Sequence, residues 1–187
     1  MRRRHLKGVM AIERQVYPRP WSPNLFLAEM SESRDRLYIV AREDREVVGY
    51  GGLMVSGDEA HITTIAVEPR HHRRKVGTRV LFELIHGALR MGAVAVSLEV
   101  RVTNWGAQRM YGRFGFRPVG IRKNYYQETN EDALIMWTDD IRTPEFGKRL
   151  ERIVSPLPPV ARDPDVRSQW ERWVPWRGMP EAVGGED

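Results

Sequence analysis

Short hydrophobic runs separated by polar turns dominate the chain after residue 35. Three of these runs are strand candidates because they are rich in Val, Ile, Tyr and Thr: residues 36–43, 46–55 and 60–69. Since only charged or Gly-Asp turns connect them, we expect an antiparallel meander. Later apolar runs predict a buried strand and a closing strand pair, at residues 93–100, 116–126 and 131–140.

The segments between these runs repeat their apolar residues every three or four positions, as amphipathic helices do. The first helical signal covers residues 5–17, and a second helix begins with Ser22 as N-cap and Pro23 at its first position. Residues 76–92 have one apolar and one charged face, and residues 104–115 form a shorter helix. Helices and strands in this order predict an α/β fold.

The character of the chain changes after residue 142. The later part is rich in proline and in small polar residues, and such segments are held loosely. We therefore expect a domain over residues 1–142 and a partly disordered extension over residues 143–187, with a short helix near residues 144–153. The three tryptophans of "WERWVPW", Trp170, Trp173 and Trp176, either pack locally or bind a partner.

Composition narrows the class of protein further. The 187 residues contain 41% hydrophobic and 29% charged residues, which is typical of a globular domain. The absence of cysteine excludes disulfides and cysteine-ligated metal, and it fits a reducing compartment. No apolar run reaches the ~20 residues of a membrane helix, and the basic start lacks the apolar core of a signal peptide. We expect a soluble, cytoplasmic protein without a membrane partner.

The basic run "RHHRRK" lies between a predicted strand and the start of the helix at residues 76–92. Unpaired N–H groups and the helix dipole favour an anion at such a position, and Gly77 lets the backbone approach closely. A solvated basic turn is the alternative. The net charge of +5 suits nucleotide phosphates, ribosomal RNA or solubility alone. Without interleaved aromatic residues, direct DNA binding is not expected.

Three motifs together resemble the GCN5-related N-acetyltransferases (GNAT): "HHRRKVGTRVL", "LEVRVTNWGAQRMYGRFGF" and "RKNYY" followed by "EDALIMW". More narrowly, they resemble the RimI-like branch, whose members acetylate the N-terminal alanine of a small-subunit ribosomal protein. The resemblance covers residues 1–140. It implies a mixed, mostly antiparallel sheet, flanked by helices, in which a parallel strand pair is splayed at the acetyl-CoA site.

The same resemblance implies acetyl-CoA as co-substrate, bound by a loop of pattern Gln/Arg-x-x-Gly-x-Gly/Ala. Here His72 and Lys75 depart from this pattern, whereas Gly77 matches the second glycine. The backbone of the preceding strand is expected to pair with the pantetheine arm. The implied acetyl-CoA contacts are Ile65, Ala66, Val67, Arg73, Arg74, Lys75, Val76, Gly77, Thr78 and Asn104.

Two residues are the candidates for acid–base chemistry. In the RimI-like branch the glutamate of "LEVR" is the catalytic base and the later tyrosine is the general acid, which implies these roles for Glu99 and Tyr111. Spacing alone leaves alternatives open. Glu99 could be a strand-end carboxylate paired with a basic neighbour such as Arg101, and Tyr111 could be a core residue of its helix.

The acceptor is expected to enter between the first two helices and the last strand pair. The residues implied there are Trp21, Tyr125, Tyr126, Glu131 and Asp132. The two tyrosines could instead serve hairpin packing, and the two acidic residues could belong to a turn. His71 and His72 lack convergent ligands nearby in sequence, so no metal is expected.

We therefore expect an N-terminal protein acetyltransferase that transfers acetyl directly within a ternary complex. The expected partner is the N-terminus of a ribosomal protein, with ribosome association as a further expectation. Two alternatives remain. One is a GNAT enzyme that acetylates lysine or a small-molecule amine. The other is a non-catalytic ribosome- or RNA-binding protein that uses the basic loop and the tryptophan-containing tail.

Overall fold

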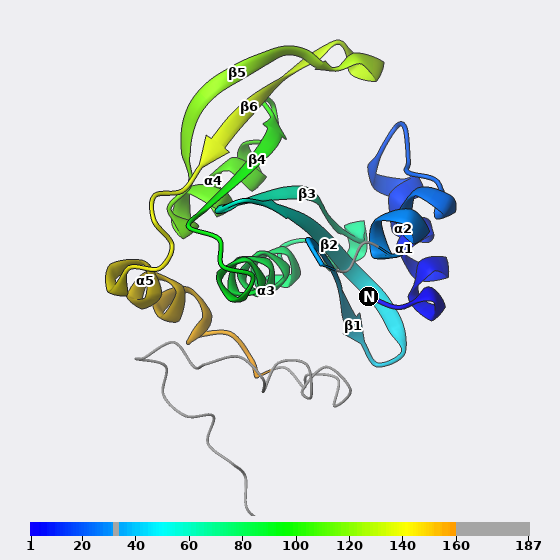
Figure 1. The fold of residues 1–187 in the computed structure, drawn as a ribbon. Helices are drawn as coiled ribbons and strands as arrows, with labels where there is room; N and C mark the ends of the chain where they lie inside the picture. The colour runs from blue at the N-terminus through cyan, green and yellow to red at the C-terminus, as the bar shows by residue number, and fades with distance from the viewer. Residues whose placement is uncertain (32–33, 160–187) are drawn as a thin grey trace, which may run out of the picture. The chain divides into compact units, whose positions relative to one another are not determined.

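A six-stranded mixed sheet forms the centre of the computed structural model, in the order β1-β2-β3-β4-β6-β5 (Figure 1). Every neighbouring pair is antiparallel except β3 and β4, so the predicted α/β class with one parallel pair is confirmed. The strands are β1 (Arg36–Glu43), β2 (Glu46–Ser56), β3 (Glu59–Val67), β4 (Ala95–Arg101), β5 (Arg117–Tyr126) and β6 (Glu131–Trp137).

The structure describes residues 1–31 and 34–159. Helices surround the sheet: α1 (Leu6–Val16), α2 (Pro23–Ser31), α3 (Val76–Arg90), α4 (Trp105–Phe114) and α5 (Pro144–Val154). Short 3₁₀ turns lie at Arg3–His5, Pro69–His71 and Gln127–Thr129. None of the helices in the described ranges combines the length and apolar composition needed to span a membrane.

Local sequence signals set the helix ends as predicted. The Ser22 hydroxyl accepts a hydrogen bond from the backbone N–H of Leu25 at 3.1 Å. The Asn104 side chain accepts from the N–H of Ala107 at 3.1 Å, so it caps α4. Gly115 follows the same helix with a φ of 98°, a left-handed conformation that suits glycine.

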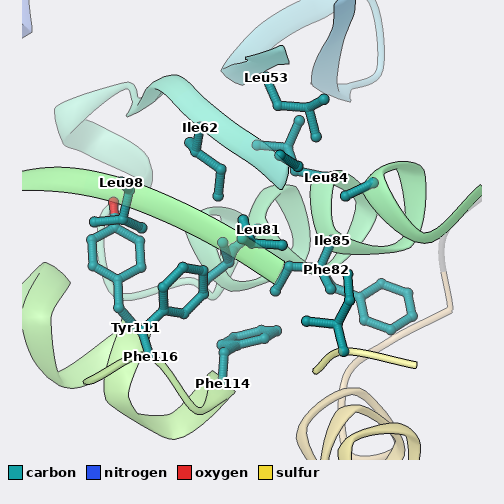
Figure 2. Packing of buried hydrophobic residues seen from close by; sticks show 14 of the residues in the cluster. Leu53, Ile62, Leu81, Phe82, Leu84, Ile85, Leu98, Tyr111, Phe114 and Phe116 are labelled. Atoms are coloured by element: carbon teal, nitrogen blue, oxygen red, sulfur yellow. The ribbon is translucent and has the colours of Figure 1, made fainter. Parts of the chain in front are cut away.

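The main core lies between the sheet and the helices α3, α4 and α5. Figure 2 shows Leu81, Leu84 and Ile85 of α3 packing with Leu53, Ile62 and Leu98 of the sheet. Phe114 is fully buried in the same cluster. A Cβ atom at Gly51 would lie 2.8 Å from side-chain atoms of Val80 and Leu84. Glycine at this position of β2 therefore allows α3 to approach the sheet closely.

A second, smaller core holds α1 and α2 against β1–β3 (Figure 1). Phe26 and Tyr50 are fully buried there and make an edge-to-face contact with ring centroids 5.7 Å apart. The buried Glu13 accepts hydrogen bonds from the Tyr50 hydroxyl and, at 2.7 Å, from the backbone N–H of Trp21. This carboxyl group thus joins the loop between α1 and α2 to the sheet.

The parallel pair parts halfway along its length. Residues 59–62 of β3 pair with residues 95–98 of β4. Beyond Leu98, β4 continues along β6, and beyond Ile62, β3 continues along β2. Figure 1 shows the two strands diverging. The separation of β3 from β4 forms the opening in which the candidate site lies.

Helix α5 belongs to the same compact unit as the sheet. The Thr143 side chain caps it, and Phe146, Leu150 and Ile153 are buried in the main core. The compact unit runs from Met1 to Pro156, whereas a division after residue 142 was expected. The tryptophans at 170, 173 and 176 lie outside the described residues.

Candidate active site

A cavity of about 330 Å³, termed the cleft below, opens where β3 and β4 part. Its walls come from both strands, from the loop after α1, from the start and middle of α4, and from the β5 hairpin. Predicted site residues in its lining are Trp21, Ile65, Glu99, Asn104, Tyr111, Tyr125 and Tyr126. The structure therefore brings together the residues expected for chemistry and most of those expected for the acceptor.

Glu99 lies at the base of the parting, with a side chain that is only 7% exposed. His61 Nε2 of β3 lies 3.0 Å from Glu99 Oε2, and Arg122 Nη1 of β5 lies 3.3 Å from Glu99 Oε1. The hydrogen bond from His61 is the largest cause that lowers the pKa of Glu99, and the charge of Arg122 adds to it, against the opposing effect of burial. Glu99 is thus held as a carboxylate beside two cationic or proton-donating groups.

The alternative pairing of Glu99 with Arg101 is not found. Arg101 instead donates to Glu128 at 2.7 Å and to Glu131 at 2.9 Å. Its guanidinium also lies 3.9 Å from the centre of the Tyr126 ring, a cation–π distance. Arg101 therefore fastens the tip of the β5–β6 hairpin over the cleft.

Tyr111 is both a core residue and a wall of the cleft. Figure 2 shows its ring rising from α4 beside Leu98, with the hydroxyl directed toward β4. Burial raises the pKa of Tyr111, and the nearby phenols of Tyr17 and Tyr126 raise it further. Tyr111 is thus protonated at neutral pH and can donate a proton, as a general acid must.

The open edge of β3 offers backbone groups to the cleft. Alternate residues of a strand direct their N–H and C=O groups to opposite edges. Because the N–H of Glu68 donates to Val48 O on β2, the backbone groups of Ile65 and Val67 point away from β2 and those of Ala66 point toward it. Two side chains occupy the open edge: the Tyr17 hydroxyl donates to Ile65 O at 3.1 Å, and His72 Nε2 lies 3.0 Å from Val67 O.

The basic run forms the loop that leads into α3. Arg70, His71 and Arg74 are engaged by Glu43 and Glu68. Within the described residues, no ion pair engages Arg73 or Lys75. Both adopt positive φ angles, of 63° and 65°. Lys75 is also the N-cap of α3, and its side chain makes no capping hydrogen bond.

The start of α3 therefore combines backbone N–H groups without helical acceptors with two cationic residues, Arg73 and Lys75. The N–H groups of Val76, Gly77 and Thr78 are in the first turn, where an α-helix leaves them without internal acceptors. The left-handed conformation at Lys75 is the one that the family's first glycine suits. A Cβ atom at Gly77 would lie 3.5 Å from Val67 Cγ2, an ordinary contact. The position therefore accommodates the Gly/Ala choice of the motif.

Two of the predicted acceptor residues do not line the cleft. Glu131 is bound by Arg101 and Thr103, and Asp132 is bound by Lys123 and by the N–H of Asn124. Both carboxylates stabilise the hairpin in this structure. Trp21, Tyr125 and Tyr126 do line the cleft, and Tyr125 and Tyr126 form an edge-to-face pair at 5.1 Å.

Sequence reasoning missed His61, Tyr17 and Glu13. The signal for His61 was present: Glu59, His61 and Thr63 alternate with the apolar Ala60 and Ile62 along β3, so one strand face is polar. The pattern did not reveal that this face lies beside Ser97 and Glu99 of β4. In the described part of the chain, no cluster of three or more His, Cys, Asp or Glu side chains could hold a metal ion.

The fold and the site define an N-acetyltransferase of the GNAT type. The model of the Acetyltransferase (GNAT) family matches residues 6–116. This is more than half of the chain, and the chain belongs to that family.

Two relatives and one solved structure make the likeness more specific. A Bacillus subtilis (strain 168) protein, provisionally named a ribosomal protein bS18-alanine N-acetyltransferase, is 38% identical over 137 residues, covering 73% of this chain and 91% of the relative. The Salmonella typhimurium enzyme of that name is 35% identical over 133 residues, covering 70% and 88%. The crystal structure of the Escherichia coli ribosomal-protein-S18-alanine N-acetyltransferase superposes with a TM-score of 0.68 at 29% identity, covering 75% and 90%.

Proposed function

We propose that this protein transfers an acetyl group from acetyl-CoA to the N-terminal α-amine of a protein, with the N-terminal alanine of a small-subunit ribosomal protein as acceptor. The observation that carries the proposal is the placement of Glu99 and Tyr111 on the walls of one cleft, at the parting of β3 and β4. The relatives named above act on ribosomal protein bS18, which supports this acceptor. Such an acceptor would place the protein in the cytoplasm, in contact with ribosomal proteins or ribosomes.

The residues of the cleft, together with the start of α3 and the outer edge of β3 beside it, fit acetyl-CoA. The free N–H groups at the start of α3, with Arg73 and Lys75 beside them, suit a pyrophosphate. The open edge of β3 at Ile65 and Val67 suits the amide groups of a pantetheine arm, which would add to the sheet like another strand. Asn104 lines the cleft as well. Acetyl-CoA supplies an acyl group that is already activated as a thioester.

Glu99 is placed to accept the proton of the acceptor amine. An α-ammonium group has a pKa near ~8, so a carboxylate in a mostly buried site suffices as general base, directly or through one water. Arg122 is 56% exposed and its nitrogen is 3.3 Å from Glu99 Oε1. It is a weak partner that an incoming ammonium group can replace at this oxygen.

Tyr111 is placed to protonate the leaving thiolate. Its phenol is kept neutral by burial, and a neutral phenol can give its proton to a thiolate as the C–S bond breaks. Since the base stands on β4 and the acid on α4, the two proton transfers occur at different walls of the cleft. This arrangement allows direct transfer, without an acyl-enzyme intermediate on a cysteine, and the chain contains no cysteine.

The acceptor wall favours a chain end over a mid-chain residue. Trp21 and Tyr126 come from opposite sides of the cleft, and Glu13 and Arg101 hold the segments that carry them. The aromatic rings of this wall suit a short N-terminal segment, and the carboxylate of Glu99 in the lining would attract its cationic amine.

Intact mass spectrometry of a peptide panel tests the proposal. The panel contains a peptide with an N-terminal alanine from the small-subunit ribosomal protein, the same peptide with a blocked α-amine, and one with only a lysine amine free. We expect one added acetyl group on the free α-amine alone, and none with the Glu99→Gln variant. Acetylation of the lysine amine alone would mean that the acceptor is a lysine side chain and not a protein N-terminus. Failure of acetyl-CoA to bind would overturn the enzymatic function itself.

A further inference from the structure

A second cavity of about 330 Å³ adjoins the cleft on the far side of Glu99. His61, Glu99 and Tyr125 line both cavities, so these side chains form the wall between them. The second cavity is also lined by Glu59, Ser97 and Arg122, together with Met54, Ser56, Ile135 and Trp137. It lies over the closed part of the β3–β4 pair, where His61 and Ser97 are direct register partners.

An unbroken row of polar contacts runs along this wall. His61 Nε2 is 3.0 Å from Glu99 Oε2, and His61 Nδ1 is 2.9 Å from Ser97 Oγ. The Ser97 hydroxyl donates to Glu59 Oε1 at 2.8 Å. Ser97 is 3% exposed. The row therefore connects the carboxylate in the cleft to a carboxylate in the second cavity through a buried hydroxyl.

The hydrogen bonds along this row fix which nitrogens of His61 carry a proton. The one hydroxyl proton of Ser97 is given to Glu59, which can only accept. The contact with Ser97 then requires a proton on His61 Nδ1. A neutral imidazole protonated on Nδ1 has a bare Nε2, which would face Glu99 Oε2 as acceptor against acceptor. The His61–Glu99 pair therefore holds one further proton.

We propose that Glu59 and Ser97 act through His61 as positioning residues for the base, Glu99. This inference rests on the function proposed above. The Ser97 hydroxyl, anchored by Glu59, fixes the tautomer and the orientation of the His61 ring. Nε2 therefore faces Glu99 Oε2, and the proton that this pair shares stays between them.

Besides His61, the charged and titratable side chains that line the second cavity are Glu59, Glu99, Arg122 and Tyr125. Arg122, the cation in this group, contacts Glu99 and lies 5.7 Å from the centre of the Tyr125 ring. It therefore does not replace the contact between Ser97 and His61.

Nuclear magnetic resonance of the imidazole nitrogens tests the assignment without acetyl transfer. In wild-type protein at neutral pH, we expect His61 Nδ1 to carry a proton, with the signal assigned by its loss in His61→Gln. In Glu59→Gln, the new amide can donate to Ser97, and the Ser97 hydroxyl can then donate to His61 Nδ1. We therefore expect Nδ1 to become a bare acceptor in this variant. A bare Nδ1 in the wild-type protein at neutral pH would overturn the hydrogen-bond assignment.

Kinetics of acetyl transfer test the positioning role. We expect Glu59→Gln and Ser97→Ala to lower kcat on the order of 10-fold or more, with the KM for peptide and the Kd for acetyl-CoA nearly unchanged. Ser56→Ala is the matched control, because Ser56 lines the second cavity outside the row of contacts. Equal kcat values in all four proteins would refute the positioning role. If wild type transfers acetyl to no amine, the proposed function fails, whereas the imidazole measurement still decides the assignment of His61.

Discussion

The two strands that border the cleft contribute to it in different ways. Beyond Ile62, the open edge of β3 presents the backbone groups of Ile65 and Val67. Beyond Leu98, β4 presents the side chain of Glu99, and the helix that follows presents Tyr111. In the proposed function, the β3 edge therefore binds through backbone groups that every residue has, and the β4 side reacts through side chains that only particular residues have. Substitutions should affect turnover strongly on the β4 side and affinity mildly on the β3 side.

The largest effect is expected from Glu99→Gln. Loss of a general base lowers turnover by ~10²–10⁴-fold, and the amide keeps the shape of the side chain, so acetyl-CoA should bind as before. Steady-state kinetics and calorimetry separate the two quantities. Asp139→Asn is the control, since Asp139 is exposed and pairs with Arg117 away from the cleft. Wild-type turnover in Glu99→Gln would remove Glu99 from the mechanism.

Tyr111→Phe should give the next largest effect. Removing the hydroxyl takes away the proton for the thiolate, and we expect turnover to fall by about 10–10²-fold. The phenyl ring still fills the core beside Phe116, whose centroid lies 5.8 Å away. Acetyl-CoA affinity and the melting temperature should therefore change little. The role of general acid is refuted if kcat is unaffected.

Glu13 of α1 lines the cleft, and its contribution to stability can be tested by varying the pH. Burial raises the pKa of Glu13 above its ordinary value of 4.5. A raised folded-state pKa means that the folded protein holds the proton more tightly, so its stabilising contribution is present below pH 4.5 and is lost as pH rises through the folded-state pKa.

Glu13→Gln should remove this dependence. The amide oxygen can still accept from the N–H of Trp21, and we expect the variant to gain stability relative to wild type as pH rises from about 4 to 8. Urea unfolding at several pH values measures the difference. Glu13→Ala, which leaves that N–H without its acceptor, should cost about 1–3 kcal/mol. A pH-independent difference for Glu13→Gln would contradict the raised pKa.

Lys75 tests the loop that leads into α3. Its left-handed conformation costs a non-glycine residue roughly 1–2 kcal/mol, so Lys75→Gly should raise the free energy of unfolding by about 1 kcal/mol. The same change removes a cation from the expected pyrophosphate site and should weaken acetyl-CoA binding. Lys75→Asn separates the two effects, because asparagine also tolerates this conformation. Identical Kd values by calorimetry for all three proteins would show that the Lys75 charge does not contribute.

The smallest effects are expected at the edge of β3. If pantetheine binds to Ile65 O and Val67 O as proposed, the side chains of Tyr17 and His72 must first leave these carbonyls. Each hydrogen bond is worth about 1 kcal/mol, so Tyr17→Phe and His72→Ala should each tighten acetyl-CoA binding by roughly fivefold or less. Calorimetry with both variants checks this. Weaker binding in both would mean that the two side chains assist the cofactor.

Much of the fold was predictable because its signals are local. The caps at Ser22 and Asn104 and the left-handed Gly115 follow from residue type at a helix end. Periodicity predicted the apolar face of α3. The carboxyl group of Glu99 and the phenol of Tyr111 were identified only through the family motifs, since spacing favoured a surface carboxylate and a core tyrosine.

Long-range pairings were not predictable. Residues two apart on a strand share one face, so Arg101 was a reasonable partner for Glu99, but Arg101 instead reaches the hairpin at Glu128 and Glu131. His61 reaches Glu99 because β3 and β4 run parallel in a register that places His61 beside Ser97. No property of either segment alone specifies this register.

By itself, the sequence determined the order of the elements, the basic turn before α3 and the identity of the two catalytic candidates. The tertiary structure decided which side chains share the cleft, which carbonyls of β3 point away from β2, and which carboxylates are bound within the hairpin. The physical reason is the distance along the sequence over which each kind of interaction acts. Caps, turns and amphipathic faces depend on neighbours within a few residues, whereas the row from Glu59 to Glu99 exists only after packing sets how β3 and β4 meet and part.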